Sequence, residues 1–407
     1  MRILFIVPYS PNPIRVRPFE FLRTLAGHHH ELTLASVFTG EGELRDLHDL
    51  ADFTIETKAF ELTTARRAWN VLGALPSTIP LQAAYSWQPA LAQSIVNLIR
   101  TGSFDVIHVE HIRGARYAQM AKDVLTRGRI PTPIVWDSVD CISELFRLAS
   151  VRSRSFFGRW VTRFELPRTT RYEAELIRSF DTTLVTSPND REALLALGQG
   201  DGEPGPIEVV PNGVNLEYFA PNPSVARRQD QIVMTGKMSY HANVTMVVDF
   251  IERIFPLIRR ARPDVNLTVV GKDPSPEIRE LAKDPAISVT GTVQDMRPYL
   301  WQSTLAVAPM TYSVGIQNKV LEALATATPI VTSTGVSRSI NLAHGESALI
   351  ADDPKLFAEH VLRLLDDPTL RDAMGRRGRE LAEQEYGWEG VTRKMEDIYR
   401  GLIHAHR

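Results

Sequence analysis

Short, mostly hydrophobic runs alternate with longer helical patterns along the first half of the chain. The runs are Ile3 to Val7, Glu31 to Val37, Asp52 to Leu62, Asp105 to Val109, Ile134 to Trp136 and Thr182 to Val185. A short continuous apolar run is typical of a strand buried on both faces. Polar turns and helical patterns, such as Phe19 to Ala26, lie between the runs. This alternation predicts a parallel sheet covered by helices on both faces.

A second series of the same kind follows the linker-like stretch Gly198 to Pro206. Its predicted strands are Ile232 to Met234, Val265 to Val270, Ile287 to Thr290, Leu305 to Ala308 and Ile330 to Thr332. Between the first two of these strands the pattern predicts a helix from about Asn243 to Arg260, and a long helical pattern runs from Trp388 to His404. The second half of the chain therefore repeats the architecture of the first.

Chain length agrees with this division, because 407 residues are too many for a single hydrophobic core. We expect an α/β protein with two Rossmann-like, doubly wound domains that face a central cleft. Residues 1–204 are assigned to the first domain, residues 205–386 to the second and residues 387–407 to a C-terminal helix. A cleft between facing strand ends suits an enzyme with two substrates.

Composition narrows the class of protein. The chain has 43% hydrophobic and 23% charged residues, which is typical of a soluble globular protein. A net charge of −2 argues against a nucleic-acid partner. The single cysteine, Cys141, excludes an internal disulfide and suits the reducing cytoplasm. The apolar run at the N-terminus is too short for a signal peptide, and no stretch is long enough to span a bilayer.

An unusual segment lies between Arg147 and Arg171. Seven arginines alternate there with four aromatic residues: Arg147, Arg152, Arg154, Phe156, Phe157, Arg159, Trp160, Arg163, Phe164, Arg168 and Arg171. Such a segment suits peripheral contact with the inner face of an anionic membrane, or an acidic acceptor. A surface helix with a solvated arginine face explains the same pattern, so both interpretations stay open.

Polar residues at predicted strand ends mark candidate sites, because ligands of parallel sheets bind there. In the first domain these are Pro8 to Arg17, His111 and Asp137 to Asp140. The loop from Pro8 lacks the glycine fingerprint of a dinucleotide site, which argues against a dehydrogenase.

The most informative stretch of the second domain is Gly315 to Thr328, G-I-Q-N-K-V-L-E-A-L-A-T-A-T. It predicts a loop that leads into a helix N-terminus, where backbone N–H groups favour an anion. Lys319 and Glu322 lie one turn apart, so the lysine can reach a phosphate and the carboxylate a pair of sugar hydroxyls. An ordinary amphipathic helix with solvated charges fits this stretch equally well.

A second phosphate-binding candidate is T-G-K-M at 235–238. Gly236 allows close approach of a ligand to the backbone at a strand end, and Lys237 adds a positive charge. Lys237 and Lys319 together can stabilise a leaving diphosphate without a metal. A lysine after a strand is more often a solvated surface charge, so the motif does not decide the function by itself.

Five motifs together resemble a known family. They are V-V-P-N-G-V-N-L-E-Y-F at 209–219, T-G-K-M-S-Y-H-A-N at 235–243, V-V-G at 269–271, V-T-G-T-V-Q-D at 289–295 and G-I-Q-N-K-V-L-E-A at 315–323. Over nearly its whole length the chain resembles the family 4 retaining glycosyltransferases, which have the two-domain GT-B architecture. It is most similar to the bacterial sugar transferases associated with exopolysaccharide and exosortase gene clusters.

The resemblance implies roles for charged residues of the second domain. Glu322 matches the second glutamate of the family's E-x7-E motif, a ribose-hydroxyl clamp, whereas the first glutamate falls at Val314 and is absent. Lys237 matches a phosphate-binding arginine. The family's partner lysine falls at Ala242 and is also absent, and Lys319 is our candidate for its replacement.

It also implies a donor-binding surface made largely of backbone. Gly315, Ile316 and Gln317 match positions that offer N–H groups to the diphosphate or sugar, and Gly291 to Val293 match the base-binding edge. The candidate donor-binding residues are Gly236, Gly291, Thr292, Val293, Gly315, Ile316, Gln317, Asn318, Val320 and Glu322. In the first domain, His111 matches a histidine near the transferred sugar, although a structural hydrogen bond explains it equally well. The C-terminal helix is expected to cross back to the first domain.

The implied reaction transfers a sugar from a nucleotide-diphosphate sugar to an acceptor hydroxyl with retention at the anomeric carbon. The acceptor is a sugar, a lipid-linked group or a small molecule, and the departing phosphate takes the acceptor proton, so neither cofactor nor metal is expected. Lys237, Lys319 and His111 are the expected catalytic residues. Two alternatives stay open: a nucleotide-sugar epimerase of the same fold, and a non-catalytic sugar-nucleotide-binding protein.

Overall fold

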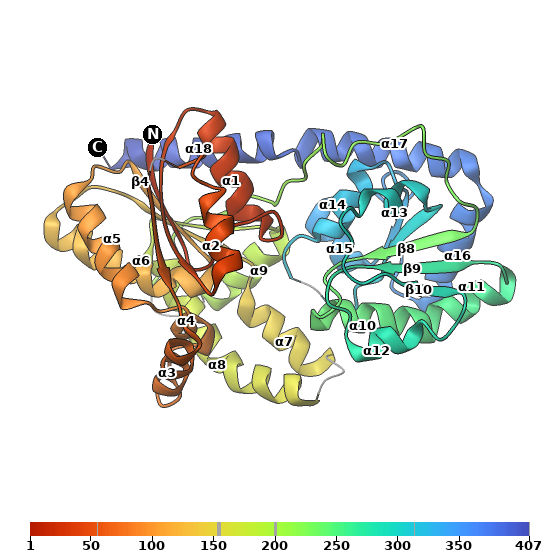
Figure 1. Cartoon of the computed structure of the whole chain (residues 1–407), viewed down its shortest axis with the longest axis horizontal. Coiled ribbons are helices and arrows are strands. Elements are labelled where there is room, and N and C mark those ends of the chain that lie inside the picture. The colour runs from red at the N-terminus through yellow and green to blue at the C-terminus, as the bar shows by residue number, and fades with distance from the viewer. Residues whose placement is uncertain (55, 153–155, 199–201, 313, 407) are drawn as a thin grey trace. The chain divides into compact units, whose positions relative to one another are not determined.

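The computed structural model describes residues 1–54, 56–152, 156–198, 202–312 and 314–406. The chain divides into two compact units (Figure 1). Unit 1 comprises Met1–Arg147, Val161–Pro211 and Trp388–Arg407, and unit 2 comprises Leu148–Trp160 and Asn212–Gly387. Each unit contains a parallel sheet with helices around it, so the predicted α/β class with two Rossmann-like domains is confirmed.

The sheet of unit 1 has seven strands among the described residues, in the order β3-β2-β1-β4-β5-β6-β7. Every pairing between neighbours is parallel. The strands are β1 (Arg2–Val7), β2 (Glu31–Phe38), β3 (Glu56–Glu61), β4 (Val106–Glu110), β5 (Ile134–Val139), β6 (Thr182–Val185) and β7 (Ile207–Val209). The direction of the strand order reverses between β1 and β4.

The sheet of unit 2 follows the same plan, with six parallel strands among the described residues in the order β10-β9-β8-β11-β12-β13. The strands are β8 (Gln231–Thr235), β9 (Asn266–Val270), β10 (Ile287–Val289), β11 (Leu305–Ala308), β12 (Ile330–Thr332) and β13 (Leu349–Ile350). Here the reversal lies between β8 and β11. The hydrophobic pattern does not predict β13, because two residues are too few to show a period.

Helices connect the strands of each sheet. The first ten are α1 (Val16–Gly27), α2 (Glu41–His48), α3 (Thr64–Ala74), α4 (Leu81–Tyr85), α5 (Pro89–Thr101), α6 (His111–Gly128), α7 (Ile142–Arg152), α8 (Phe156–Ser179), α9 (Pro188–Leu197) and α10 (His241–Asp249). The others are α11 (Phe255–Ala261), α12 (Pro276–Leu281), α13 (Arg297–Gln302), α14 (Asn318–Ala325), α15 (Thr334–Ile340), α16 (Pro354–Asp366), α17 (Pro368–Glu385) and α18 (Trp388–Ala405). No helix in the described ranges is both long and apolar enough to cross a membrane.

The single helix predicted from Asn243 to Arg260 is wrong in one respect. A π-helical turn, η1 (Phe250–Ile254), separates α10 from α11. Pro256 lies in the first turn of α11. Because proline has no N–H group and its ring clashes with the preceding turn, the regular hydrogen-bond ladder cannot continue through this position.

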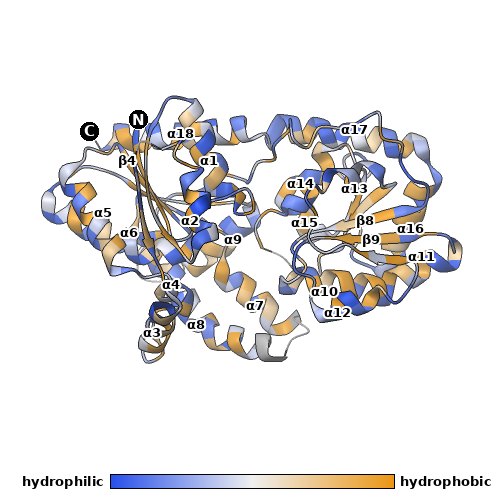
Figure 2. Cartoon of the chain, viewed as in Figure 1, coloured by the Kyte–Doolittle hydropathy of each residue, from blue (hydrophilic) through white to orange (hydrophobic). Residues whose placement is uncertain are grey.

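The central strands are buried because they contribute side chains to both faces of their sheet. In β1, Leu4 and Ile6 belong to one hydrophobic cluster, and Ile3, Phe5 and Val7 belong to another. All five are fully buried. Figure 2 shows that β8 and β9 of unit 2 are also largely hydrophobic, whereas the surrounding helices carry both hydrophobic and hydrophilic residues. The continuous apolar runs in the sequence reflect this double burial.

The division between the units falls after Pro211, and not at residue 204 as expected from the linker-like stretch. Strand β7 pairs in parallel with β6 and completes the sheet of unit 1. A glycine-rich stretch marks a loop, but only strand pairing shows which sheet the next strand joins. That pairing moves the boundary by several residues.

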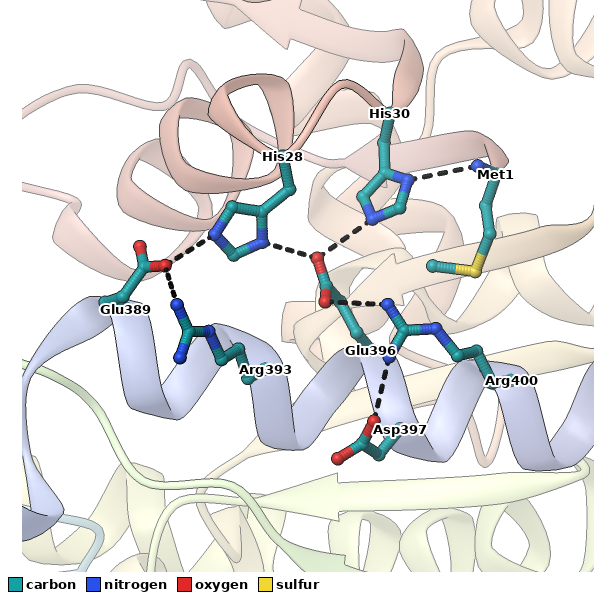
Figure 3. A network of polar contacts seen from close by, with 8 residues as sticks. All are labelled: Met1, His28, His30, Glu389, Arg393, Glu396, Asp397 and Arg400. Carbon is teal, nitrogen blue, oxygen red and sulfur yellow. Dashed lines mark hydrogen bonds and ion pairs between the residues drawn. The ribbon is translucent and has the colours of Figure 1, made fainter.

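Helix α18 packs within unit 1, where Trp388, Met395 and Tyr399 join a hydrophobic cluster. The Trp388 ring meets the Phe21 ring edge-on, with 5.4 Å between centroids. Polar contacts extend this packing (Figure 3). His28 contacts Glu396 through Nδ1 at 2.6 Å and Glu389 through Nε2 at 2.8 Å. The C-terminal helix is therefore held to unit 1 by apolar packing and by ionisable groups.

Candidate active site

The carboxyl ends of β8 and β11 meet at the point where the strand order of unit 2 reverses. At such a point the loops after two neighbouring strands diverge to opposite faces of the sheet and leave room for a ligand. The loop after β8 contains Gly236 and Lys237, and the loop after β11 leads through Gly315 into α14. The structure thus brings together the two stretches that the sequence singles out in this unit.

Two glycines let the chain pass closely at this edge. Gly236 has φ of +147° and Gly271, at the end of β9, has φ of +156°. A Cβ atom on Gly271 would lie 1.7 Å from the carbonyl oxygen of Gly236, which no side chain can tolerate. The Gly236 N–H donates to the carbonyl of Val270 at 3.1 Å. The V-V-G motif therefore fixes the path of the lysine-bearing loop.

Lys319 lies in the first turn of α14 and is held by neutral side chains. Its Nζ donates to Asn243 Oδ1 and to Gln317 Oε1, both at 2.9 Å, and lies 3.5 Å from Met310 Sδ. Burial lowers the pKa of Lys319 to about 8, although the negative charge of Glu322 raises it. The ammonium is therefore fixed in position, but neutral amides, and no carboxylate, accept its hydrogen bonds.

Glu322 lies one helical turn after Lys319. Burial raises the pKa of Glu322 to about 7, although the positive charge of Lys319 lowers it. Among the described residues the Glu322 side chain accepts no hydrogen bond and forms no ion pair. A carboxylate in this state has unused acceptor capacity, as a clamp for hydroxyl groups requires.

Asn243 connects the two lysine-bearing segments. Its Oδ1 accepts from Lys319, and its Nδ2 donates to the backbone carbonyl of Lys237 at 2.9 Å. In the sequence, Asn243 is only the last residue of the T-G-K-M-S-Y-H-A-N motif, and the motif does not predict its role. The signal for that role is a polar residue in a helical stretch that is otherwise mainly apolar.

Lys237 contrasts with Lys319, because its side chain is exposed. Within the part of the chain that the structure describes, its ammonium makes no hydrogen bond and no ion pair. Met238, fully buried, anchors the loop, and its N–H donates to the backbone carbonyl of Lys272 at 2.8 Å. The fold thus holds the backbone of this loop and leaves the Lys237 charge uncompensated.

The loop before α14 is fastened by amide contacts. Gly315 and Ile316 are buried, and Gln317 Nε2 donates to the carbonyl of Val314 at 3.2 Å. Asn318 Oδ1 accepts from Asn212 Nδ2 at 3.0 Å, which ties the P-N-G-V-N motif to the start of the helix. These contacts order the backbone that the resemblance assigns to the diphosphate.

Val320 is the exception among the predicted donor-binding residues. Its side chain is fully buried in the core of unit 2, and its N–H donates to the carbonyl of Gln317 at 2.8 Å. The side chain of Val320 therefore has a packing role, because successive helix residues point in different directions. Its predicted contact with a donor stays a prediction.

Gly291, Thr292 and Val293 follow β10, the edge strand of the same sheet. The order β10-β9-β8 places this loop two strands from Lys237, about 10 Å across the sheet edge at the usual spacing of about 4.8 Å. They share a sheet edge with the lysines, but no hydrogen bond or ion pair joins the two groups within the described residues.

In unit 1 the same kind of position lies between β1 and β4, and several of its polar groups are paired. Arg17 and Asp137 form a buried ion pair at 2.7 Å, and Arg17 also donates to the carbonyls of Val210 and Pro211. Tyr9 donates to Glu110 at 2.5 Å. Two of the residues that the sequence singles out, Arg17 and Asp137, are thus partners of one another at this edge.

His111 begins α6 with a φ of +63°, a conformation that side chains seldom adopt. Burial, and then the charge of Arg113, lower the pKa of His111 to about 3, so the ring is neutral at pH 7. The Arg113 N–H donates to its Nδ1 at 3.3 Å, so the ring proton is on Nε2. His111 therefore has one donor, Nε2–H, available for a ligand.

Two charged groups beside His111 are shifted in opposite directions. Burial, and then the charge of Asp137, raise the pKa of Glu110 to about 8. Burial lowers the pKa of Arg113. Among the described residues no group of three or more His, Cys, Asp and Glu side chains is arranged to hold a metal.

Comparison with known proteins agrees with this geometry. Residues 16–218 match the family described as Glycosyltransferase Family 4, and residues 229–367 match the family described as Glycosyl transferases group 1. The two matched regions together cover most of the chain. The chain belongs to the superfamily of GT-B glycosyltransferases that includes group 1 and family 4.

Individual relatives are distant. D-inositol 3-phosphate glycosyltransferase of Kribbella flavida is 26% identical over 74% of this chain and 72% of its own. The corresponding protein of Corynebacterium diphtheriae is 25% identical over 56% and 57%. A GDP-mannose-dependent monoacylated alpha-(1-6)-phosphatidylinositol monomannoside mannosyltransferase of Corynebacterium glutamicum is 28% identical over 47% and 55%. The chain thus spans less than two thirds of the length of two of these three relatives. The narrower link to exopolysaccharide or exosortase clusters stays a prediction.

Solved structures share the fold. Sucrose-phosphate synthase of Thermosynechococcus elongatus has a TM-score of 0.68 at 16% identity and covers 100% of both chains. Anabaena HepE in complex with UDP and glucose has a TM-score of 0.69 at 13% identity and covers 98% of this chain and 100% of its own.

Proposed function

We propose that this protein is a retaining glycosyltransferase that transfers a sugar from a nucleotide-diphosphate sugar to an acceptor hydroxyl. One observation carries the proposal. At the switch point of unit 2, two lysines belong to adjoining segments, and Asn243 bridges Lys319 to the backbone of Lys237. Neither ammonium is paired with a carboxylate among the described residues. Positive charge that is positioned but uncompensated suits a diphosphate.

The arrangement along the sheet edge matches the shape of a nucleotide sugar. In our proposal the diphosphate contacts Lys237, Lys319 and the N-terminus of α14, where the helix dipole adds positive potential. Glu322 accepts from ribose hydroxyls one turn further along. The loop from Gly291 to Val293 borders the base, at about the distance that separates a base from its diphosphate.

The chemistry follows from these positions. The bond between the anomeric carbon and the diphosphate oxygen breaks, and the acceptor oxygen bonds to that carbon on the same face. The departing phosphate oxygen takes the acceptor proton, so no protein base is required. Negative charge develops on the diphosphate, and fixed cations stabilise it more in the transition state than in the ground state. His111 is proposed to donate its Nε2–H to the transferred sugar.

Lys319 also suits the role of the lysine that the family carries at the position of Ala242. Its Nζ binds Asn243, the residue next to Ala242. A lysine from α14 therefore brings its charge to α10, the helix that carries Ala242. The same charge reaches the site from a different element, and this supports an active enzyme over a non-catalytic binding protein.

Names of the relatives suggest donors and acceptors to test first. One relative is GDP-mannose-dependent, and the HepE structure contains UDP and glucose. Acceptors in the relatives' names are inositol phosphates and phosphatidylinositol mannosides. We propose a cytoplasmic role in polysaccharide or glycoconjugate synthesis, with a sugar, lipid-linked or small-molecule acceptor.

A thermal-shift screen with UDP, GDP and ADP, followed by their sugars, tests the donor assignment. A nucleotide that binds only the folded state raises the melting temperature, by an amount set by its concentration relative to Kd. We expect one base to give a clear shift that Lys319→Ala abolishes. A screen in which no nucleotide shifts the wild-type protein would contradict the proposal. Release of nucleotide diphosphate with an acceptor, but not without one, would exclude an epimerase.

A further inference from the structure

Helix α3 in unit 1 is packed with its polar side toward the protein. Arg67 donates to the Tyr85 hydroxyl at 2.8 Å, and Asn70 Nδ2 donates to the carbonyls of Tyr85 and Trp87 at 3.2 and 2.7 Å. The apolar side faces outward: Trp69 is 72% exposed and Leu72 is 58% exposed. This orientation is the reverse of the usual one for a surface helix.

The outward face continues past the end of the helix. Leu75, the C-cap residue, is 43% exposed. Figure 1 shows α3 beside α4 and α8 at the rim of unit 1. An open cavity of about 510 Å³ borders the helix, lined by Thr64, Arg67, Ala68, Val71, Leu72 and Tyr85. Trp69, Leu72 and Leu75 therefore form an exposed apolar patch, which we call the α3 patch. Patches of this kind on a protein surface mark interaction sites.

The α3 patch lies in a stretch of sequence that has no acidic residue. From Leu62 to Phe104 the sequence contains no aspartate or glutamate. Arg66 is exposed on the helix itself. The neighbouring acid of α8, Glu165, is buried and accepts from the Leu81 N–H at 2.7 Å. An apolar face that carries an exposed arginine and lies in a stretch without acidic residues is complementary to an anionic lipid surface.

The arginine-rich segment from Arg147 to Arg171, which is predicted to meet a membrane, contributes to the α3 patch through Arg168. Arg154 lies outside the described residues, and so do the side chains of Arg152, Phe156, Phe157 and Arg159. Of the described part, Arg147 pairs with Glu144 at 2.6 Å. Arg168 donates to the carbonyls of Ala74 and Leu75 at 3.4 and 2.5 Å. Arg168 thus supports the C-terminal end of α3.

We propose that α3 is an interfacial helix that docks this protein on an anionic bilayer. Trp69, Leu72 and Leu75 enter the boundary between headgroups and acyl chains, where tryptophan is favoured. Arg66 faces the lipid phosphates. The hydrogen bonds of Arg67 and Asn70 keep the helix fixed to unit 1 with its apolar side outward. This inference does not depend on the proposed transferase activity.

Vesicle co-sedimentation of the full chain, without nucleotide, tests the proposal. We compare vesicles of phosphatidylcholine alone with vesicles that contain about 30 mol% phosphatidylglycerol. Binding is expected to the anionic vesicles only, and to weaken at high salt because salt screens the arginine charges. The double variant Trp69→Ser/Leu72→Ser should reduce the partition coefficient at least about tenfold, because it removes two large apolar side chains. Arg66→Glu should weaken binding to anionic vesicles.

Leu356→Ser on α16 is the matched control, because Leu356 is 42% exposed and lies in unit 2. It should bind like the wild type, and all variants should keep the wild-type melting temperature. Loss of a blue shift in tryptophan emission in Trp69→Phe would locate the contact at α3.

Three outcomes would overturn the proposal. They are wild-type binding to vesicles by the double variant, absence of binding to either vesicle, and a concentration-dependent dimer in solution that the double variant abolishes. The last outcome would assign the patch to a second copy of the chain.

Discussion

The two sheets share one strand order, yet the polar groups at their switch points are arranged in opposite ways. In unit 1 they bind one another, as in the Arg17–Asp137 ion pair and the Tyr9–Glu110 hydrogen bond. In unit 2 Lys319 is held by amides, and Lys237 has no partner among the described residues. The same backbone plan therefore carries an internally compensated cluster in one unit and uncompensated positive charge in the other. We infer that the first mainly stabilises the fold and the second binds an anion.

The largest expected effect comes from breaking the compensated cluster. Asp137→Asn leaves Arg17 buried without a counter-charge, so we expect the free energy of unfolding of unit 1 to fall by about 3–5 kcal/mol. Urea unfolding followed by circular dichroism measures the change. Arg17→Met combined with Asp137→Leu should recover part of the loss, because both charges are removed. A cost below about 1 kcal/mol for Asp137→Asn would mean that water reaches the pair.

Removing a cation from unit 2 should affect activity and leave the fold intact. Lys319→Ala is expected to lower kcat/KM by about 100- to 1000-fold, as for other groups that stabilise transition-state charge. The melting temperature should change little, because the lost hydrogen bonds are to neutral amides. Steady-state kinetics with the donor found in the nucleotide screen measures the effect. Lys283→Ala, an exposed lysine paired with Glu280, is the control; equal effects of the two variants would refute the role of Lys319.

Asn243→Ala should have a smaller effect of the same kind. Asn243 touches both lysine-bearing segments, so its loss leaves the Lys319 side chain held by Gln317 alone without removing its charge. We expect about a tenfold decrease in kcat/KM, the equivalent of one ordinary hydrogen bond. Partial rescue by Asn243→Gln, which keeps the amide, would distinguish positioning from general damage. Unchanged kinetics in Asn243→Ala would show that α14 alone positions Lys319.

The pH dependence of donor binding tests whether the positive charge of Lys319 contributes to affinity. Burial lowers the pKa of Lys319 to about 8, so affinity in the wild type should fall as pH rises above that value. Arginine stays protonated in this range. Lys319→Arg should therefore bind more weakly at pH 7 but lose the alkaline decline. An alkaline limb that persists in Lys319→Arg would assign the titration to another group.

The smallest expected effect concerns the network of unit 1 in Figure 3. Burial alone would lower the pKa of His28, but hydrogen bonds to Glu396 and Glu389 outweigh it and raise the pKa. The folded state thus favours protonated His28, so its contribution is present below the unfolded pKa and is lost as pH rises through the folded value. His28→Gln should destabilise unit 1 at about pH 6 and have little effect at about pH 8. Equal destabilisation at both values, in urea unfolding, would contradict this sign.

His30 in the same network responds in the opposite direction. Burial lowers its pKa, although the hydrogen bond to Glu396 raises it, so His30 favours the neutral form in the folded state. Its contribution is lost as pH falls, and His30→Gln is therefore the matched comparison for His28→Gln. A larger cost at pH 6 for His28→Gln than for His30→Gln is the expected result.

Much of this protein was determined by local sequence. Continuous apolar runs identified most of the buried strands of both sheets, since a strand buried on both faces needs no polar side chain. Strand ends located Lys237 and Lys319, because ligands in parallel sheets bind at that edge.

The tertiary structure decided which residues meet. Asn243 and Lys319 lie 76 positions apart and share a hydrogen bond that no local pattern records. Val320, next to Lys319, lies in the core. Strand β7 joins unit 1 by pairing with β6. Helical periodicity in α3 separates a polar from an apolar side, but only the partners of Arg67 and Asn70 show that the polar side faces inward. The hydrophobic period of a helix or strand shows which residues share a face. Only contacts between segments distant in sequence decide whether that face packs against the protein or against solvent.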